Sequence, residues 1–151
     1  MWVQVTALSL ILSLILSYLL NGITLVEALL ISFDIGNFST NSEYGKNRDL
    51  ILASLPSNVS TKGGFLTTSI GQNSNKVYTL AMCRGDSSPY ACYECIYRSI
   101  HNLVTSCPNQ KEALSYARSL CHVHYSDRSF YGTLELKPVR QALIMTTSRR
   151  T

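Results

Sequence analysis

Polar and apolar residues in the first half of the chain's body alternate with a helical period. The tetrapeptide TNSE, residues 40–43, has the form of a capping box, in which Thr40 caps the amide of Glu43 and Glu43 reaches back. The apolar residues that follow share one helical face: Tyr44, Ile51, Leu52 and Leu55. Proline cannot continue the hydrogen-bond ladder, so the pattern predicts a first helix that Pro56 ends.

Runs with a period of two come next. Residues 65–70, FLTTSI, alternate after a Gly63-Gly64 turn, and residues 77–83, VYTLAMC, are rich in branched and aromatic side chains. Residues 121–126, CHVHYS, alternate in the same way, so all three runs predict strands. The segment EALSYARSL, residues 112–120, has helical propensity but also a short alternation, and its pattern leaves helix and strand open.

A second helix is predicted after residue 88. Ser87 and Ser88 are helix-capping residues, and Pro89 suits the first helical position. The apolar face of this helix carries two cysteines, because the residues that recur at helical spacing are Cys92, Cys95, Ile96, Ile100 and Leu103.

The N-terminal segment has the pattern of a secretory signal peptide. Residues 1–26 carry no charge, and the apolar run of residues 7–20 is shorter than the about 20 residues that span a membrane. Val26 and Ala28 fit a cleavage after residue 28, so residues 1–28 are predicted to be removed. No Lys or Arg precedes the apolar run, and an uncleaved signal anchor is the alternative.

The excess of positive charge is concentrated at the C-terminal end. All 13 Lys and Arg follow residue 28, and residues 137–151 hold four of them without an acidic residue. The body before this tail is close to neutral, which argues against nucleic-acid binding, and the tail is predicted to be a solvated terminus. The 123 residues that follow residue 28 suffice for one small domain.

Three kinds of chemistry suit the five cysteines. Cys92, Cys95, Cys107 and Cys121 could hold zinc with His122 and His124 nearby, but their spacing lacks a second close pair. The CYEC tetrapeptide at a helix start is also compatible with redox chemistry. In a secreted chain, a disulfide framework is the expected arrangement. Because five is odd, one thiol stays free or pairs with another chain, and spacing alone does not identify it.

Catalytic constellations are not evident in the sequence. Of the three histidines, His122 and His124 share one face of a predicted strand, for which a polar surface is the simplest interpretation. His101 and Cys107 lie six residues apart around the end of the second helix, and nothing in the pattern brings them together. With no phosphate loop, paired acids or nucleophile elbow, the chain is predicted to have no catalytic residues, no metal and no cofactor.

Two Asn-x-Ser triplets, at Asn37 and Asn58, are candidate glycosylation sites in a secreted chain.

The cysteine spacing C-x8-C-x2-C in CRGDSSPYACYECI, followed by CPNQKEAL and CHVHYSDRSFYG, resembles the plant ginkbilobin-homologous domain, the cysteine-rich stress and antifungal module. The resemblance also includes VYTLAMCRGD and GNFSTNSEYGKNRDLILASLPSNV, and it covers about residues 32–133. It implies an α+β fold, with two helices packed on a five-stranded antiparallel sheet and stapled by disulfides. The expected organisation is a signal peptide at 1–28, the cysteine-rich domain at 29–136 and the basic tail at 137–151.

The family resemblance also implies a pairing. The bridges would be Cys83–Cys92 and Cys95–Cys121. Cys107 would pair with a cysteine at the position that Ser32 occupies here, so Cys107 is predicted to be the free thiol.

Mannose-binding members of this family are similar to one another in an Asn, an Arg and a Glu around the first and last cysteines. Phe33, Ser115 and Ser126 stand at those positions here. Since Phe33 offers no hydrogen bond and two small hydroxyls replace a cation and an anion, the resemblance does not imply a lectin site.

Members of the family are secreted plant proteins of the cysteine-rich repeat secretory type or ectodomains of receptor-like kinases. The resemblance therefore implies a non-enzymatic binding module for stress or defence, secreted to the apoplast, whose partner is a cell-surface protein or a carbohydrate. A relative of receptor-like kinase ectodomains that competes for their partners is the second hypothesis. A degraded gene product without a stable function is the third.

Overall fold

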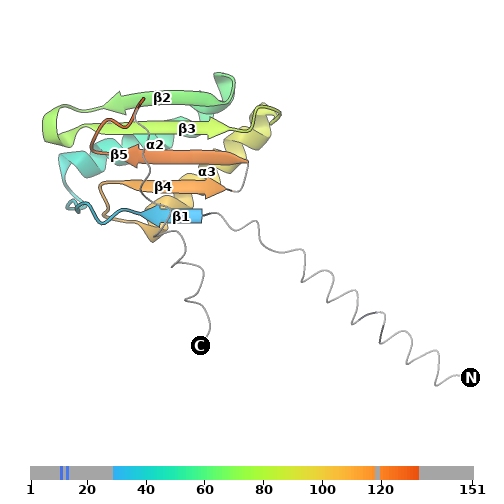
Figure 1. Cartoon of the computed structure of the whole chain (residues 1–151), viewed down its shortest axis with the longest axis horizontal. Coiled ribbons are helices and arrows are strands. Elements are labelled where there is room, and N and C mark those ends of the chain that lie inside the picture. The colour runs from blue at the N-terminus through green and yellow to red at the C-terminus, as the bar shows by residue number, and fades with distance from the viewer. Residues whose placement is uncertain (1–10, 12, 14–28, 118–119, 133–151) are drawn as a thin grey trace, which may run out of the picture.

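The computed structural model describes residues 11, 13, 29–117 and 120–132. It has the expected α+β architecture, in which two helices pack on one face of a five-stranded sheet (Figure 1). The sheet order is β1-β4-β5-β3-β2, and every neighbouring pair is antiparallel. The elements are, in chain order, β1 (Leu29–Ser32), α2 (Glu43–Thr61), β2 (Phe65–Ile70), the 3-10 turn η1 (Asn73–Asn75), β3 (Val77–Cys83), α3 (Pro89–Ser106), β4 (Ala113–Ala117) and β5 (Cys121–Ser126).

Three predicted strands and the start of the second helix are confirmed. Residues 65–70, 77–83 and 121–126 form β2, β3 and β5. Helix α3 begins at Pro89, and the side chain of Ser88 accepts a hydrogen bond from the amide of Ala91, as an N-cap does. The open question at residues 113–117 is resolved as strand β4, because this segment lies between β1 and β5 and pairs with both.

Both predicted ends of the first helix are wrong. The N-cap of α2 is Ser42, whose side chain accepts from the amide of Gly45, while Thr40 contacts Asn109 instead. The helix also continues through Pro56 to Thr61. Its buried face extends past the proline to Val59, which is fully buried, so packing against the sheet outweighs the hydrogen bond that proline removes.

The core lies between the helices and the sheet face turned toward them, the inner face. Side chains from both layers are fully buried there, including Leu55 and Val59 of α2, Ile96 and Leu103 of α3, and Val123 of β5. The alternation along each strand sends the next side chains to the opposite, outer face of the sheet. Figure 1 views the molecule from this outer face, with the helices behind the sheet.

The predicted signal peptide lies outside the described residues except for Ile11 and Ser13, and the predicted basic tail lies wholly outside them. Within the described ranges, neither helix combines the length and the hydrophobicity that crossing a bilayer requires.

Candidate functional site

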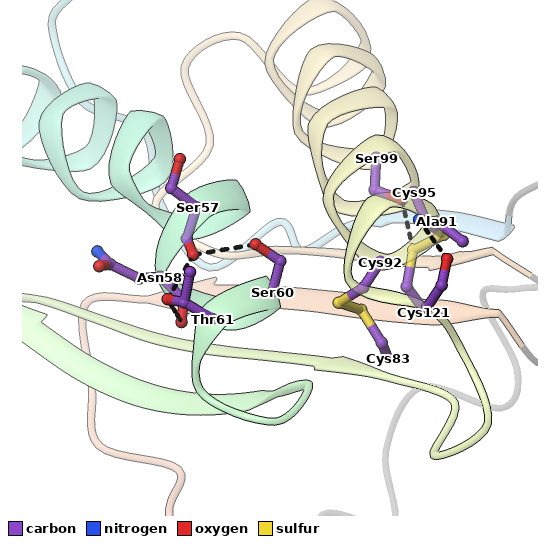
Figure 2. Close-up of a disulfide and its surroundings, with 11 residues drawn as sticks. Ser57, Asn58, Ser60, Thr61, Cys83, Ala91, Cys92, Cys95, Ser99 and Cys121 are labelled. Carbon is purple, nitrogen blue, oxygen red and sulfur yellow. Dashed lines mark hydrogen bonds between the residues drawn. A yellow bond between two sulfur atoms is a disulfide. The ribbon is translucent and has the colours of Figure 1, made fainter.

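Two disulfides fasten α3 to the sheet. Cys92 is bonded to Cys83 at the end of β3, and Cys95 is bonded to Cys121 at the start of β5, with Cα atoms 5.6 and 6.1 Å apart. These are the pairs that the family resemblance implies. Figure 2 shows both bridges beside the first turns of α3, with Ser99 close to Cys121. Because Cys92 and Cys95 bond to different partners, CYEC is not a redox pair, and the zinc alternative loses three of its four thiolates.

Cys107 forms no disulfide within the part of the chain that the structure describes. It caps the C-terminal end of α3, is almost completely buried, and its sulfur contacts the hydroxyl of Ser32 on β1. Burial raises the pKa of the Cys107 thiol. A buried thiol with a raised pKa is a poor nucleophile, and His101 lies exposed on α3, so these two residues do not form a catalytic pair.

A buried carboxylate that the sequence pattern does not reveal lies immediately before β4. Glu112 is fully buried and accepts hydrogen bonds from His124 Nε2 at 2.9 Å and from Ser126 Oγ at 3.1 Å. Arg128 reaches the same carboxylate at 3.2 Å. Burial favours the neutral acid, but the hydrogen bond and charge of His124, with Arg128 and Ser126, outweigh it and hold the pKa of Glu112 below its ordinary value.

The interpretation of His122 and His124 as a polar surface is wrong for His124. Its side chain is largely buried against Glu112, and its ring stacks on Phe130 with centroids 3.9 Å apart. His122 is partly buried two residues earlier on the same face. Burial, with the neighbouring His124, lowers the pKa of His122 to about 4, so His122 is neutral at pH 7.

A row of large side chains crosses the outer face of the sheet. The strand register places Phe65 beside Met82, Met82 beside His122, and His122 beside Tyr116. Leu29, on the edge strand β1, lies beside Tyr116. We call these five residues the open stripe, because Phe65, Met82 and Tyr116 are 54, 44 and 45% exposed. None of the five carries a charge at neutral pH, which favours an apolar or uncharged partner over a charged one.

The three positions that correspond to the sugar-binding residues do not form an open site. Ser115 is fully buried on the inner face, toward the helices, whereas Ser126 is buried on the outer face beside Glu112. Phe33 is also mostly buried. No common surface therefore presents these side chains to a sugar.

Both glycosylation candidates are exposed. Asn58 lies on the solvent side of α2, next to the fully buried Val59, and Asn37 lies in the segment between β1 and α2. Neither lies on a strand of the outer face, although whether they carry sugar stays a prediction.

Comparison with protein families places most of the described chain in one domain. The model of the salt stress response/antifungal family matches residues 32–128. Among curated proteins, cysteine-rich receptor-like protein kinase 14 of Arabidopsis thaliana is 46% identical over 105 residues, which is 68% of this chain and 16% of that protein. Cysteine-rich receptor-like protein kinase 11 of the same plant is 42% identical over 120 residues, 78% of this chain and 18% of that protein. The chain thus spans less than a fifth of the length of these relatives.

Solved structures share the fold. The tandem DUF26 ectodomain of the Arabidopsis thaliana cysteine-rich receptor-like protein PDLP5 matches with a TM-score of 0.61 and 22% identity, over 67% of this chain and 49% of that chain. The tandem DUF26 ectodomain of PDLP8 matches with a TM-score of 0.62 and 24% identity, over 67% and 48%. At this identity the likeness establishes the fold alone.

Proposed function

Because this chain belongs to the salt stress response/antifungal family, we propose that it is an extracellular plant module that recognises another protein and catalyses no reaction. Its relatives include receptor-like kinases, and its solved neighbours are ectodomains. Two disulfides that fasten one helix to the sheet suit an oxidising compartment. Secretion to the apoplast, with removal of residues 1–28, and a role in stress or defence are part of this proposal.

The open stripe is the observation that carries the proposal. Contiguous exposed apolar side chains are a feature of protein interaction surfaces. The partner we propose is a second module of the same family. Each solved neighbour is described as a tandem of such modules, and this chain matches about half of it. An uncharged stripe is also suited to an apolar protein face, since it would leave no buried charge unpaired.

The positions of the two glycosylation candidates, Asn37 and Asn58, also support the open stripe as the binding surface. A glycan on Asn58 would cover the helix side of the molecule, and one on Asn37 would cover the segment before α2. We propose that both asparagines carry glycans, because this arrangement keeps the stripe accessible. The mannose-binding alternative is not favoured, since Ser115 is buried beneath the helices.

A binding measurement tests the proposal. The oxidised chain, produced by secretion, is immobilised and presented with the ectodomain of cysteine-rich receptor-like protein kinase 14 as the probe. Met82→Lys places a charge in the stripe and is expected to weaken binding about tenfold or more. Leu50→Lys is the matched control, because Leu50 is 61% exposed on α2, outside the sheet. Equal losses in the two variants, or no binding by the unmodified chain, would contradict the proposed surface.

A further inference from the structure

The open stripe by itself is too small for a stable protein–protein interface. Neighbouring strands lie about 4.8 Å apart, and residues two apart along a strand about 7 Å, so one row across five strands covers about 170 Å². A specific interface buries about 800 Å² on each partner. A partner centred on the stripe must therefore also use the adjoining part of the outer face.

That adjoining part is covered by the chain segment that follows β5. Residues 127–132, which we call the strap, turn back over the sheet, and Figure 1 shows the segment after β5 crossing in front of β3 toward β2. Phe130 stacks on His124, and the hydroxyl of Tyr131 lies 2.8 and 2.7 Å from the carbonyl oxygens of Thr68 on β2 and Thr79 on β3, which share its one proton. The strap thus covers outward side chains next to the stripe.

The strand register identifies the outer-face residues that lie next to the open stripe. Two residues along from the stripe, the next row across the sheet is Thr67, Leu80, His124, Leu114 and Ile31. Three of these five side chains are aliphatic, and none is Asp, Glu, Lys or Arg. Within this row the strap covers His124, through Phe130, whereas Thr67 is already exposed. Lifting the strap would therefore extend the uncharged surface from the stripe along β5.

Arg128 links the strap to the buried charge of the sheet. Its guanidinium lies 3.2 Å from Glu112, and its side chain is 49% exposed while Glu112 is completely buried. With the strap in place, Glu112 is shielded from water and depends on its hydrogen-bond donors. With the strap lifted, the Arg128 side chain could be fully hydrated and water could reach the carboxylate. The ion pair therefore acts as a latch that can open without leaving a buried charge unpaired.

We propose that residues 127–132 are a movable strap, latched by Arg128 on Glu112, and that a second family module binds the form in which the strap is lifted from the outer face. This inference rests on the proposed function, since it concerns the regulation of the same surface. Binding that requires a minor form is weakened by the fraction of molecules in that form, so a variant that opens the latch is expected to bind more tightly.

The ring of His124 reports strap opening without any partner. Phe130 stacks on it with ring centroids 3.9 Å apart, so lifting the strap removes the neighbouring ring from the His124 side chain. NMR relaxation dispersion of the His124 ring signals, which detects exchange with a minor form, therefore measures the population of the lifted strap.

The test compares Arg128→Ala with Arg98→Ala. Arg98 also forms an exposed ion pair, with Glu94 at 3.4 Å on α3, and is the matched control. Arg128→Ala is expected to raise the population of the lifted form, measured at the His124 ring, about tenfold, as loss of a charged hydrogen bond should, while Arg98→Ala leaves it unchanged. Binding to the kinase 14 ectodomain should tighten in Arg128→Ala. If that variant does not fold, Arg128→Gln replaces it.

The outcomes separate the two proposals. A lifted population in Arg128→Ala within twofold of that in the unmodified chain overturns the strap. A larger lifted population with unchanged or weaker partner binding also overturns the inference, because the strap would then move without controlling the surface. A larger lifted population without binding in either protein supports a movable strap and overturns the proposed function.

Discussion

The hydroxyl of Ser32 lies against the sulfur of Cys107, across the junction between β1 and the C-terminal end of α3. These two residues are 75 positions apart in the chain. Their contact gives a physical meaning to the odd cysteine count, because the family resemblance puts a half-cystine at the position of Ser32. The strand β1 is consequently held by its pairing with β4 and by packing, without a covalent link.

Ser32→Cys is expected to create a third disulfide with Cys107. Closing so long a loop restricts the unfolded chain and should stabilise the protein by about 2–4 kcal/mol. The measurements are a free-thiol count by mass spectrometry after alkylation in denaturant, and thermal melts with and without reductant. The count should fall from one to zero, and Ser32→Ala serves as the control. Two alkylated thiols in the variant would show that the side chains do not meet in solution.

Cys107 is expected to be inert in the folded protein. It is almost completely buried and its thiol pKa is raised by burial, so little thiolate is present and reagents cannot reach it. Iodoacetamide at pH 8 should leave the native chain unmodified and should alkylate one cysteine per chain in guanidinium chloride. Rapid labelling of native protein would mean that α3 or β1 opens readily, and labelling of two or more cysteines would contradict the disulfide pairing.

Asn37 and Asn58 are both expected to be glycosylated when the chain is made in a secretory host. Their side chains are exposed, and neither lies in the core. Asn37→Gln and Asn58→Gln should each remove one glycan mass from the secreted protein and should change the free energy of unfolding by less than about 0.5 kcal/mol. Intact mass spectrometry before and after glycosidase treatment measures this. A single variant that leaves the mass unchanged would remove its site from the proposal.

Local signals predicted elements more reliably than they predicted the ends of elements. Ser88 before Pro89 marks a helix start because both effects act within one turn, and the structure has this cap. The first helix differs because its ends depend on distant contacts. Thr40 meets Asn109 rather than capping the helix, and Pro56 is accepted because Val59 is buried on the core face. Neither contact can be derived from neighbouring residues.

The open stripe could be identified only from the register of the strands. Phe65, Met82 and Tyr116 are separated widely in the sequence, and each alone is an ordinary apolar residue on an alternating strand. Only the order β1-β4-β5-β3-β2 brings them into one row. Glu112 was missed for a related reason, since its partners His124 and Arg128 lie on the next strand and beyond it. The two cysteine bridges, in contrast, were accessible through the family's spacing.

His122 is expected to make the folded protein sensitive to mild acid. Its pKa is about 4 in the folded chain, against an ordinary value of 6.5, because burial and His124 disfavour its charged form. Between these values the unfolded chain binds a proton that the folded chain does not, so stability falls as the pH falls from 6.5 toward 4. The difference corresponds to at most about 3 kcal/mol. Glu112, whose pKa lies below its ordinary 4.5, stays ionised through most of this window.

Urea unfolding at pH 7 and pH 4.5 checks this expectation in three proteins. The unmodified chain should lose about 2–3 kcal/mol more than His122→Gln between the two pH values, because glutamine takes up no proton in either state. His101→Gln is the matched control, since His101 is exposed on α3 and its replacement should leave the acid sensitivity in place. If His122→Gln and the unmodified chain lose stability in parallel, the ring of His122 must be hydrated and protonated in the folded protein. The middle of the open stripe would then be charged in mild acid, which would favour an acidic partner surface over the apolar one proposed above.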